Sequence, residues 1–143
     1  MQLSKFTDYG LRLLMHLMVA TPARVSVKKV AETFDISEHH MAKVASHLAK
    51  GGFILSGRGR TGGLTLAKLP HEISIGEAVR YLSGDVSVAE CFNAGPCECR
   101  AFAQCGLRGP LYEAQQAFFA VLDRYTLDDV VARKGLMKEL LDV

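Results

Sequence analysis

No stretch of this 143-residue sequence is long and apolar enough to be a membrane span or a signal peptide. A transmembrane helix needs about 20 apolar residues, and the apolar N-terminal stretch is interrupted by Asp8, Arg12 and His16. A signal peptide needs an unbroken apolar run and a small-residue cleavage site. We therefore expect a cytoplasmic protein. Thiols stay reduced in that compartment, so clustered cysteines favour metal or redox chemistry over structural disulfides.

Catalytic motifs and repeats are also missing. The chain has no internal repeat, low-complexity tract, glycine-rich phosphate loop or nucleophile–base arrangement, so we do not expect an enzyme. Hydrophobic residues make up 49% and charged residues 22%, a composition that supports a packed core and argues against wholesale disorder. The length fits one compact domain, or a small domain with a dimerisation appendage.

The charges are unevenly distributed along the chain. Residues 1–70 contain ten Lys or Arg and four Asp or Glu, whereas residues 71–143 contain seven and eleven. A basic half beside an acidic half suggests a polyanion-binding domain fused to something else. A solvated basic surface without a partner would give the same counts.

Three helices are predicted in the first half of the chain. Apolar residues recur at helical spacing through residues 3–20, and Thr21-Pro22 ends that helix. Ser26 is suited to cap a short second helix and Ser37 a third, which Gly51-Gly52 stops. The positions expected to face the core are Leu3, Phe6, Gly10, Leu13, Leu14, Leu17, Met18, Val27, Val30, Ala31, Phe34, Met41, Val44, Ala45 and Leu48. The tight turn between the second and third helices is typical of a helix-turn-helix.

A β-hairpin is predicted directly after these helices. Residues 53–55 and 64–66 have strand character and flank a glycine-rich turn that contains Arg58 and Arg60. A helix-turn-helix followed by a basic hairpin is a winged helix. The fold class is therefore mainly α with a small β-hairpin.

The remainder of the chain divides into a helix, a loop and a longer helix. Residues 74–83 are predicted to be helical, residues 84–109 contain all four cysteines with weak periodicity, and Pro110 suits the first turn of a long helix. Thr126 and Asp129 resemble a capping box for a last short helix. We expect three regions: 1–83 for DNA binding, 84–109 as a cysteine-bearing loop, and 110–143 for dimerisation.

The third helix and the hairpin supply the residues expected to contact double-stranded DNA. A recognition helix presents hydrogen-bonding side chains at its N-terminal end to the major groove; here these are Ser37, Glu38, His39, His40 and Lys43. Arg58 and Arg60 could enter the minor groove. Lys28, Lys29 and Lys50 are placed for phosphates. Each basic residue taken singly is also compatible with plain solvation.

The four cysteines form the pattern C-x5-C-x-C-x5-C at Cys91, Cys97, Cys99 and Cys105. Structural zinc sites usually contain tight C-x2–4-C pairs, which are absent. The wider spacing suits an iron–sulfur cluster. Zinc, a thiol–disulfide switch and unliganded cysteines stay open as alternatives.

Four segments together resemble the Rrf-type superfamily of bacterial repressors. They are the opening Leu3 to Arg12, Ser37 to Lys43 in the third helix, Arg58 to Leu64 in the wing, and the cysteine loop. The resemblance covers nearly the whole chain. The motif Phe6-Thr7-Asp8-Tyr9-Gly10 and the pair His40-Met41 are most similar to the nitric-oxide-sensing branch of that superfamily.

The resemblance implies a homodimer crossed at the long helix, with a [4Fe-4S] or [2Fe-2S] cluster in the preceding loop. Members use three cysteines and a fourth ligand, which in the nitric-oxide-sensing branch is an aspartate of the other subunit's first helix; Asp8 occupies that place. The family spacing favours Cys91, Cys99 and Cys105, with Cys97 as the alternative to Cys99. A four-cysteine site is also possible and would remove the need for Asp8.

The resemblance also implies a mechanism in which the cluster and a palindromic operator are coupled ligands of the dimer. Attack of nitric oxide on the cluster would weaken DNA binding and derepress genes of nitric oxide detoxification. Three alternatives stay open: a repressor of the same fold that senses iron or iron–sulfur status, a DNA-binding protein with a zinc site or thiol switch, and an iron–sulfur enzyme or electron carrier.

Overall fold

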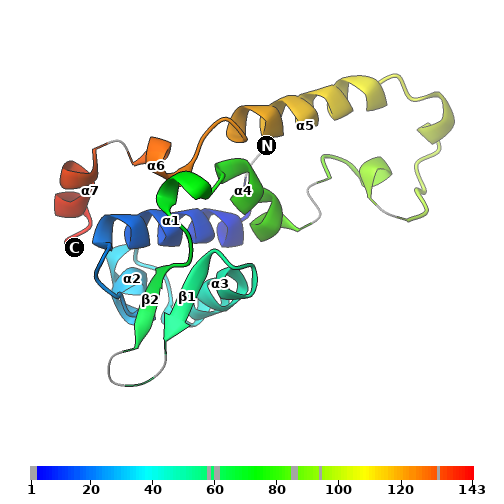
Figure 1. Cartoon of the computed structure of the whole chain (residues 1–143). Coiled ribbons are helices and arrows are strands. Elements are labelled where there is room, and N and C mark those ends of the chain that lie inside the picture. The colour runs from blue at the N-terminus through cyan, green and yellow to red at the C-terminus, as the bar shows by residue number, and fades with distance from the viewer. Residues whose placement is uncertain (1–2, 58, 60–61, 85–86, 94, 132) are drawn as a thin grey trace.

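The computed structural model describes residues 3–57, 59, 62–84, 87–93, 95–131 and 133–143. The elements, in chain order, are α1 (Lys5–Ala20), α2 (Val27–Thr33), α3 (Glu38–Lys50), β1 (Ile54–Gly57), β2 (Gly63–Leu66), the 3-10 turn η1 (Pro70–Glu72), α4 (Ile75–Ser83), η2 (Glu90–Phe92), η3 (Phe102–Gln104), α5 (Arg108–Leu122), α6 (Leu127–Val130) and α7 (Lys134–Leu140). Helix α1 runs through the centre of the body, with α2, α3 and the hairpin on one side and α4, α6 and α7 around it (Figure 1).

Serine caps begin the three N-terminal helices, as the sequence predicts for two of them. The hydroxyl oxygens of Ser4, Ser26 and Ser37 each accept a hydrogen bond from the backbone N–H three residues later. This satisfies one of the N–H groups that a helix start leaves without a partner. The predicted core positions of α3 are all buried, as are most of those of α1, whereas Leu3 is 36% exposed.

The hairpin pairs β1 with β2 in antiparallel register, from Ile54 opposite Leu66 to Gly57 opposite Gly63. The first strand was predicted at 53–55 and lies one residue further along. Phe53 lies in the turn between α3 and β1, where its backbone N–H donates to the carbonyl of Leu48 at 3.0 Å. Arg58 and Arg60, the predicted wing arginines, lie outside the described residues.

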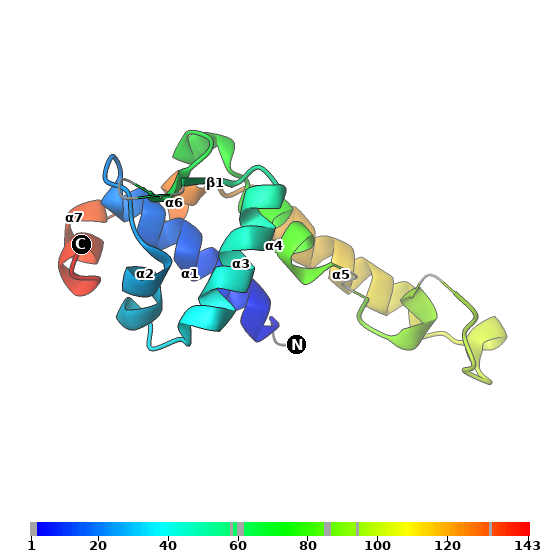
Figure 2. The same ribbon diagram turned by 90° about the horizontal axis from the view of Figure 1, so that it is seen from below.

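The C-terminal part of the chain leaves the body and then returns to it. Helix α5 projects away from the body with the cysteine-bearing segment at its far end, a shape that both ribbon views show (Figure 2). The chain then returns through α6, where Leu127 is fully buried, to α7, which contacts α1. The predicted capping box is present, and hydrogen bonds from the backbone and hydroxyl of Thr126 lower the pKa of Asp129. Helix α7 was not predicted.

Two close approaches fix α4 between α1 and α5. A Cβ on Gly10 would lie 2.5 Å from a methyl carbon of Leu82, so a glycine is needed where α1 crosses α4. A Cβ on Gly76 would collide with the carboxylate of Asp123, which follows α5. The mainly helical winged-helix fold with one hairpin is confirmed. Within the described residues, no helix has both the length and the apolarity to span a membrane.

Candidate DNA interface and cysteine segment

The N-terminal end of α3 presents a polar, exposed surface. Ser37, Glu38, His39, His40 and Lys43 are all exposed, while Met41 and Val44 of the same turns are buried. The buried residues fix the helix on the body and leave the exposed side chains free to approach a groove. The rings of His39 and His40 lie 6.2 Å apart at their centroids and are tilted by 51°, so they diverge as adjacent helical positions should.

Lys5 is a basic residue that the sequence analysis did not assign to the DNA surface. It lines a hollow of about 290 Å³ between α1 and α3, together with His40 and Lys43 from the predicted recognition surface. The hollow therefore lies between the first turn of α1 and the exposed side of α3 that is predicted to contact DNA bases. In the sequence Lys5 is separated from α3 by a full helix, and only the packing of α1 against α3 reveals this proximity.

Two of the three lysines predicted to contact phosphate are engaged in weak ion pairs. The Nζ of Lys28 lies 3.8 Å from the Glu32 carboxylate, and the Nζ of Lys29 lies 3.3 Å from the carboxylate of Asp142, next to the C-terminus. These pairs are largely exposed and of little energetic value, so a phosphate could replace either carboxylate. Lys50 is exposed at the end of α3.

A pair of aromatic side chains attaches α3 to α4. The rings of His47 in α3 and Tyr81 in α4 are stacked at 4.4 Å. The Tyr81 hydroxyl donates to the carbonyl of His47 at 2.9 Å, and the His47 Nε2 lies 3.3 Å from the carbonyl of Tyr81. Gly51 lies under the Tyr81 ring, where a Cβ would be 2.5 Å from it. This pair fixes the C-terminal half of the recognition helix, and no sequence motif indicates it.

The cysteine segment, residues 87–93 and 95–109, is held together by few contacts. The four cysteines are free thiols; Cys99 is exposed and the other three are partly exposed. Cys91 and Cys97 line one hollow of about 560 Å³, together with Arg108 and Tyr112 of α5. Short-range bonds from Ser87 to Asn93 and from the Glu98 N–H to the Glu90 carboxylate at 3.0 Å shape the loop.

The donor chemistry of this segment is compatible with an iron–sulfur cluster, whose usual ligands are cysteine thiolates. In the described part of the chain, no three His, Cys, Asp or Glu side chains converge closely enough to hold one metal ion. A cluster spreads its thiolate ligands over several iron atoms, whereas zinc gathers four ligands around one point. Four free thiols within fifteen residues, two of them on a common hollow with an arginine, match the larger group.

Asp8, the predicted fourth ligand, is in the first turn of α1. Helix α1 lies in the body, whereas the cysteine segment lies at the far end of α5 (Figure 1). The two carboxylate oxygens of Asp8 accept from the Arg12 guanidinium at 3.1 and 2.7 Å, and its side chain is 41% exposed. The preceding Thr7 is fully buried, and its hydroxyl lies 3.0 Å from that of Ser83, where the chain leaves α4 toward the cysteines. The structure thus orients Asp8 without bringing it to the cysteine segment.

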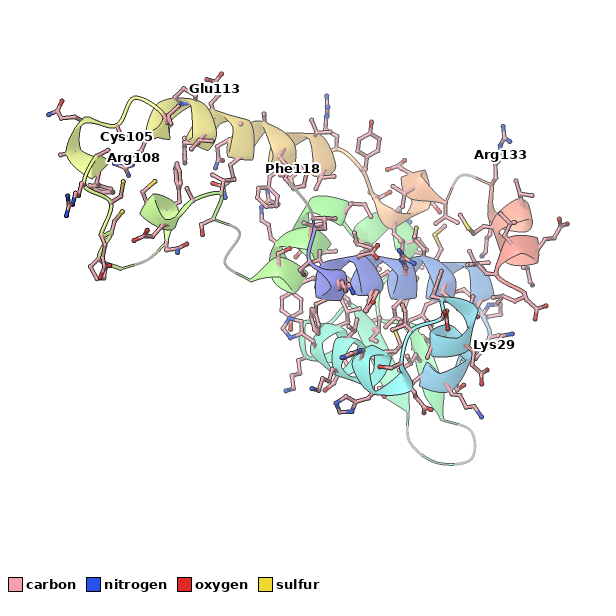
Figure 3. The ribbon with its side chains drawn as sticks, turned by 180° about the vertical axis from the view of Figure 1, so that it is seen from behind. Lys29, Cys105, Arg108, Glu113, Phe118 and Arg133 are labelled. Carbon is pink, nitrogen blue, oxygen red and sulfur yellow. The ribbon has the colours of Figure 1, made fainter. Side chains whose placement is uncertain are left out.

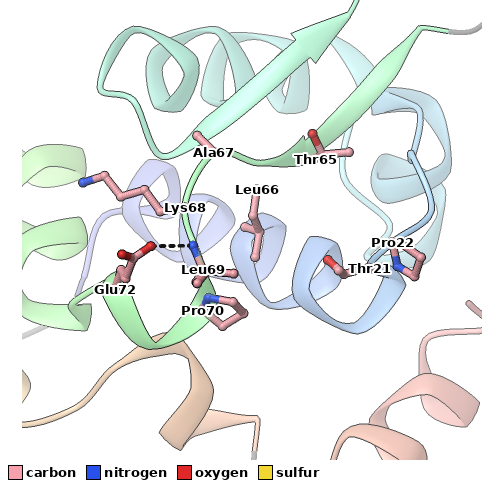
Figure 4. Close-up of a pocket in the computed structure, with 9 residues that line it drawn as sticks. All are labelled: Thr21, Pro22, Thr65, Leu66, Ala67, Lys68, Leu69, Pro70 and Glu72. Carbon is pink, nitrogen blue, oxygen red and sulfur yellow. Dashed lines mark hydrogen bonds between the residues drawn. The ribbon is translucent and has the colours of Figure 1, made fainter.

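A further hollow of about 450 Å³ lies between the end of α1, β2 and η1 and contains none of the predicted site residues (Figure 4). Lys68 and Glu72 are its charged residues, and the Glu72 carboxylate accepts from the Leu69 N–H at 2.9 Å. It is separate from both the recognition helix and the cysteines.

The helix-turn-helix, the exposed polar end of α3 and the paired hairpin define a winged-helix DNA-binding protein of the transcription-regulator class. The family model Rrf2, described as an iron-dependent transcriptional regulator, matches residues 3–133. The chain therefore belongs to the Rrf2 family.

Curated relatives support the same assignment over the full chain. The chain is 42% identical to the HTH-type transcriptional regulator NsrR of Bacillus subtilis, over 99% of this chain and 97% of the relative. It is 41% identical to the HTH-type transcriptional repressor NsrR of Streptomyces coelicolor, over 92% and 89% of the two chains.

Solved structures agree with this fold. CymR, the global cysteine regulator of B. subtilis, matches with a TM-score of 0.69 and 28% identity, over 92% of this chain and 97% of that one. IscR of T. potens matches with a TM-score of 0.74 and 25% identity, over 92% and 87%.

Proposed function

We propose that this protein is a homodimeric repressor of transcription whose affinity for a palindromic operator is controlled by an iron–sulfur cluster sensitive to nitric oxide. The observation that carries the proposal is the separation of two surfaces in one chain. An exposed, polar recognition helix lies on the body, and four free thiols lie in a loosely packed segment at the far end of α5. The similarity to regulators and repressors named NsrR supports this assignment.

The dimer part of the proposal rests on exposed apolar side chains along α5 and just beyond its two ends. Leu107, Tyr112, Val121 and Tyr125 expose between 44% and 67% of their surface in the single chain. Covering such apolar side chains with a second copy would remove them from water. Two-fold dimers of helix-turn-helix proteins place their recognition helices in successive major grooves of a palindromic site.

For the DNA contacts, we assign direct reading to the exposed end of α3. His39, His40 and Lys43 would meet base edges, while Lys28, Lys29 and Lys50 would neutralise phosphates. Lys5 joins this surface because it shares a hollow with His40 and Lys43. The wing arginines Arg58 and Arg60 remain assigned to the minor groove on the sequence alone.

For the cluster, we assign Cys91, Cys99 and Cys105 as ligands, with Asp8 of the partner subunit as the fourth. The shared hollow of Cys91 and Cys97 supports the alternative set, in which Cys97 replaces Cys99. When bound, the cluster would supply iron that reacts with nitric oxide. The thiolates of the segment would hold it, and the Arg12 pair would orient the Asp8 carboxylate toward the partner.

The experiment uses the full-length protein purified without oxygen. Its visible spectrum is recorded during a nitric oxide titration, and binding to a fragment of its own promoter is followed in parallel. We expect a visible absorbance that bleaches with nitric oxide while DNA binding falls in step. If DNA binding is lost on iron chelation but not with nitric oxide, the protein senses iron instead. Iron sensing is the second candidate function, and the description of the family as iron-dependent favours it. If the protein is colourless after iron–sulfur reconstitution and still binds DNA, the proposal that it holds a cluster is wrong.

Ligand assignment follows from the same assay on four single Cys-to-Ser variants and Asp8→Asn. We expect Cys91→Ser and Cys105→Ser to abolish cluster assembly, Cys99→Ser to do the same, and Cys97→Ser to leave it intact. The reverse result for the last two would establish the Cys97 set. Since the cysteines are outside the core, thermal unfolding of the cluster-free variants should match that of the wild type.

A further inference from the structure

Arg108 occupies the junction between the cysteine segment and α5. It is the first residue of α5, and the preceding Leu107 makes no side-chain capping bond. Its backbone N–H reaches the carbonyl of Cys105 at 3.4 Å. Cys105 and Arg108 lie side by side at the outer end of the helix, far from Lys29 on the body (Figure 3). The positive end of the helix dipole and a guanidinium therefore meet at the cysteines.

The Arg108 side chain contacts an aromatic ring but has no anionic partner among the described residues. Its guanidinium carbon lies 4.3 Å from the centre of the Phe102 ring, a cation–π contact that fixes its plane. It lines the hollow that Cys91 and Cys97 share. Its Nε is inaccessible to water and has no hydrogen-bond acceptor, and no ion pair to Arg108 is present among the described residues.

A buried donor on a charged group is costly when it lacks an acceptor. The group that completes this site should be anionic and should lie in the hollow beside the thiols. A thiolate-ligated iron–sulfur cluster carries negative charge and presents sulfur atoms, which accept N–H hydrogen bonds. An uncharged small molecule would not satisfy the guanidinium in this way.

We propose that Arg108 is a positioning residue for the cluster: its guanidinium, clamped on Phe102, donates hydrogen bonds to the cluster's sulfur and offsets its negative charge. The inference rests on the proposed function, because it requires a cluster in the cysteine segment. Arg108 is not a ligand, so its removal should leave assembly possible but weaken retention. It should also make the cluster harder to reduce, because the added electron would lose a nearby positive charge.

The chain supplies a matched control in Arg100. This arginine is in the same segment, between the third and fourth cysteines, but it is exposed and lines none of the hollows described. Arg108→Gln and Arg100→Gln remove the same charge from the same segment. Only the first removes a side chain that lines the hollow and contains a donor without an acceptor.

The test compares wild type, Arg108→Gln, Arg108→Lys and Arg100→Gln as full-length, anaerobically reconstituted proteins. Two quantities are measured: the rate at which an iron chelator bleaches the visible absorbance, and the reduction potential of the cluster. Loss of a hydrogen-bond partner of a metal ligand typically weakens metal binding by about 10-fold or more. We therefore expect about 10-fold faster bleaching and a lower potential for Arg108→Gln, partial rescue by lysine, and wild-type behaviour for Arg100→Gln.

The outcomes separate this inference from the proposed function. If the wild type holds a cluster but Arg108→Gln and Arg100→Gln behave alike, the charge acts only through the net charge of the segment and the role of Arg108 is wrong. If Arg108→Gln bleaches faster with an unchanged potential, Arg108 merely braces the loop, and the electrostatic role is again wrong. If the wild type assembles no cluster, both proposals fail together. Far-UV circular dichroism of the cluster-free variants checks that all four are equally folded.

Discussion

The winged-helix body and the cysteine segment differ in how far their side chains are buried. In the body, Leu13, Leu14 and Leu48 are fully buried, and every helix start from α1 to α4 is capped by a serine. In the segment, not one of the described residues 87–93 and 95–109 is buried. The body is therefore stabilised by apolar burial within the single chain, whereas the described part of the segment has no buried core of its own.

This difference indicates how sensing and DNA reading can share 143 residues. A segment without a core can change its arrangement at small cost in free energy, and regions with few buried contacts open most readily. In the proposed function, the body would keep the recognition helix in place while the cysteine segment responds to the signal. The comparison predicts that mutations in the two regions have separable effects on folding and on cluster binding.

The largest effect on stability is expected for Leu48→Ala in α3. Leu48 is fully buried, and removing a buried leucine side chain costs about 3 kcal/mol through lost burial and a residual cavity. The matched change in the other region is Leu107→Ala, where the side chain is 67% exposed. Urea unfolding of the cluster-free protein, at a concentration that keeps it monomeric, should show a large loss for the first and almost none for the second. Equal losses would contradict the division into two regions.

A smaller effect is expected for Tyr81→Phe, which removes one hydrogen bond from the contact between α3 and α4. The Tyr81 hydroxyl donates to the carbonyl of His47 at 2.9 Å, and the ring stack would remain. A typical buried hydrogen bond contributes about 1 kcal/mol. We expect a loss of that size in unfolding free energy and weaker DNA binding, because α3 is less firmly oriented. Tyr112→Phe, which removes an exposed hydroxyl from α5, is the control for stability and should leave the unfolding free energy unchanged.

The body could be predicted from the sequence because its patterns are local. Helical spacing of apolar residues, the Ser26 and Ser37 caps, and the Thr126–Asp129 box each depend on residues within a few positions, and all are present. The features that could not be predicted depend on contacts between distant residues. The pairing of His47 with Tyr81 and the proximity of Lys5 to Lys43 arise only when helices pack.

The cysteine segment was the least predictable part for a different reason. Its residues make few contacts within the chain, so neither spacing nor packing selects one ligand set among the four thiols. Likewise, α7 was missed because it is a short helix whose capping residue, Arg133, makes no side-chain bond. No sequence pattern indicates the buried Nε of Arg108; only the structure shows that this donor lacks an acceptor and that Arg108 lines the hollow of Cys91 and Cys97.

Acid should destabilise the body through His16, a buried histidine in α1. Burial, reinforced by the charge of Lys29, lowers its pKa below the ordinary 6.5. The Thr33 hydroxyl donates to the Lys29 carbonyl at 2.9 Å and so accepts from the His16 Nε2 at 3.4 Å, which leaves the buried Nδ1 without a partner. The folded state thus prefers the neutral ring.

The direction of the pH effect follows from that preference. Below a pH of about 6.5 the unfolded chain binds a proton at His16 that the folded chain does not, so stability is full above that pH and falls as the solution is acidified. Urea midpoints at pH 7.5 and 5.5 should therefore differ less for His16→Gln than for the wild type. His71→Gln, at an exposed histidine, should leave the difference between the two urea midpoints as in the wild type. If His16→Gln also retains the full difference, protonation of His16 does not cause the loss of stability in acid.

The smallest effect is expected where the two regions join, at the ion pair of Arg80 in α4 with Asp123 after α5. Two bonds of 2.6 and 2.7 Å connect them, and the Arg80 guanidinium also lies 4.4 Å from the Phe119 ring centre. Both side chains are nearly half exposed, so solvent screening limits their contribution to stability. Their contribution should appear instead as local order at the inner end of α5.

Asp123→Asn tests this junction by hydrogen exchange. We expect faster exchange in the last turn of α5 and unchanged exchange in α1, whereas Asp128→Asn, which removes an equal exposed charge from α6, should alter neither. Because the bond to Arg80 lowers the pKa of Asp123 below its ordinary 3.8, the wild-type junction should persist at pH 5 and weaken only as the pH falls through that lowered value. If α1 exchanged faster to the same degree, the pair would be supporting the whole body. The cysteine segment would then be less independent of the body than its lack of buried residues implies.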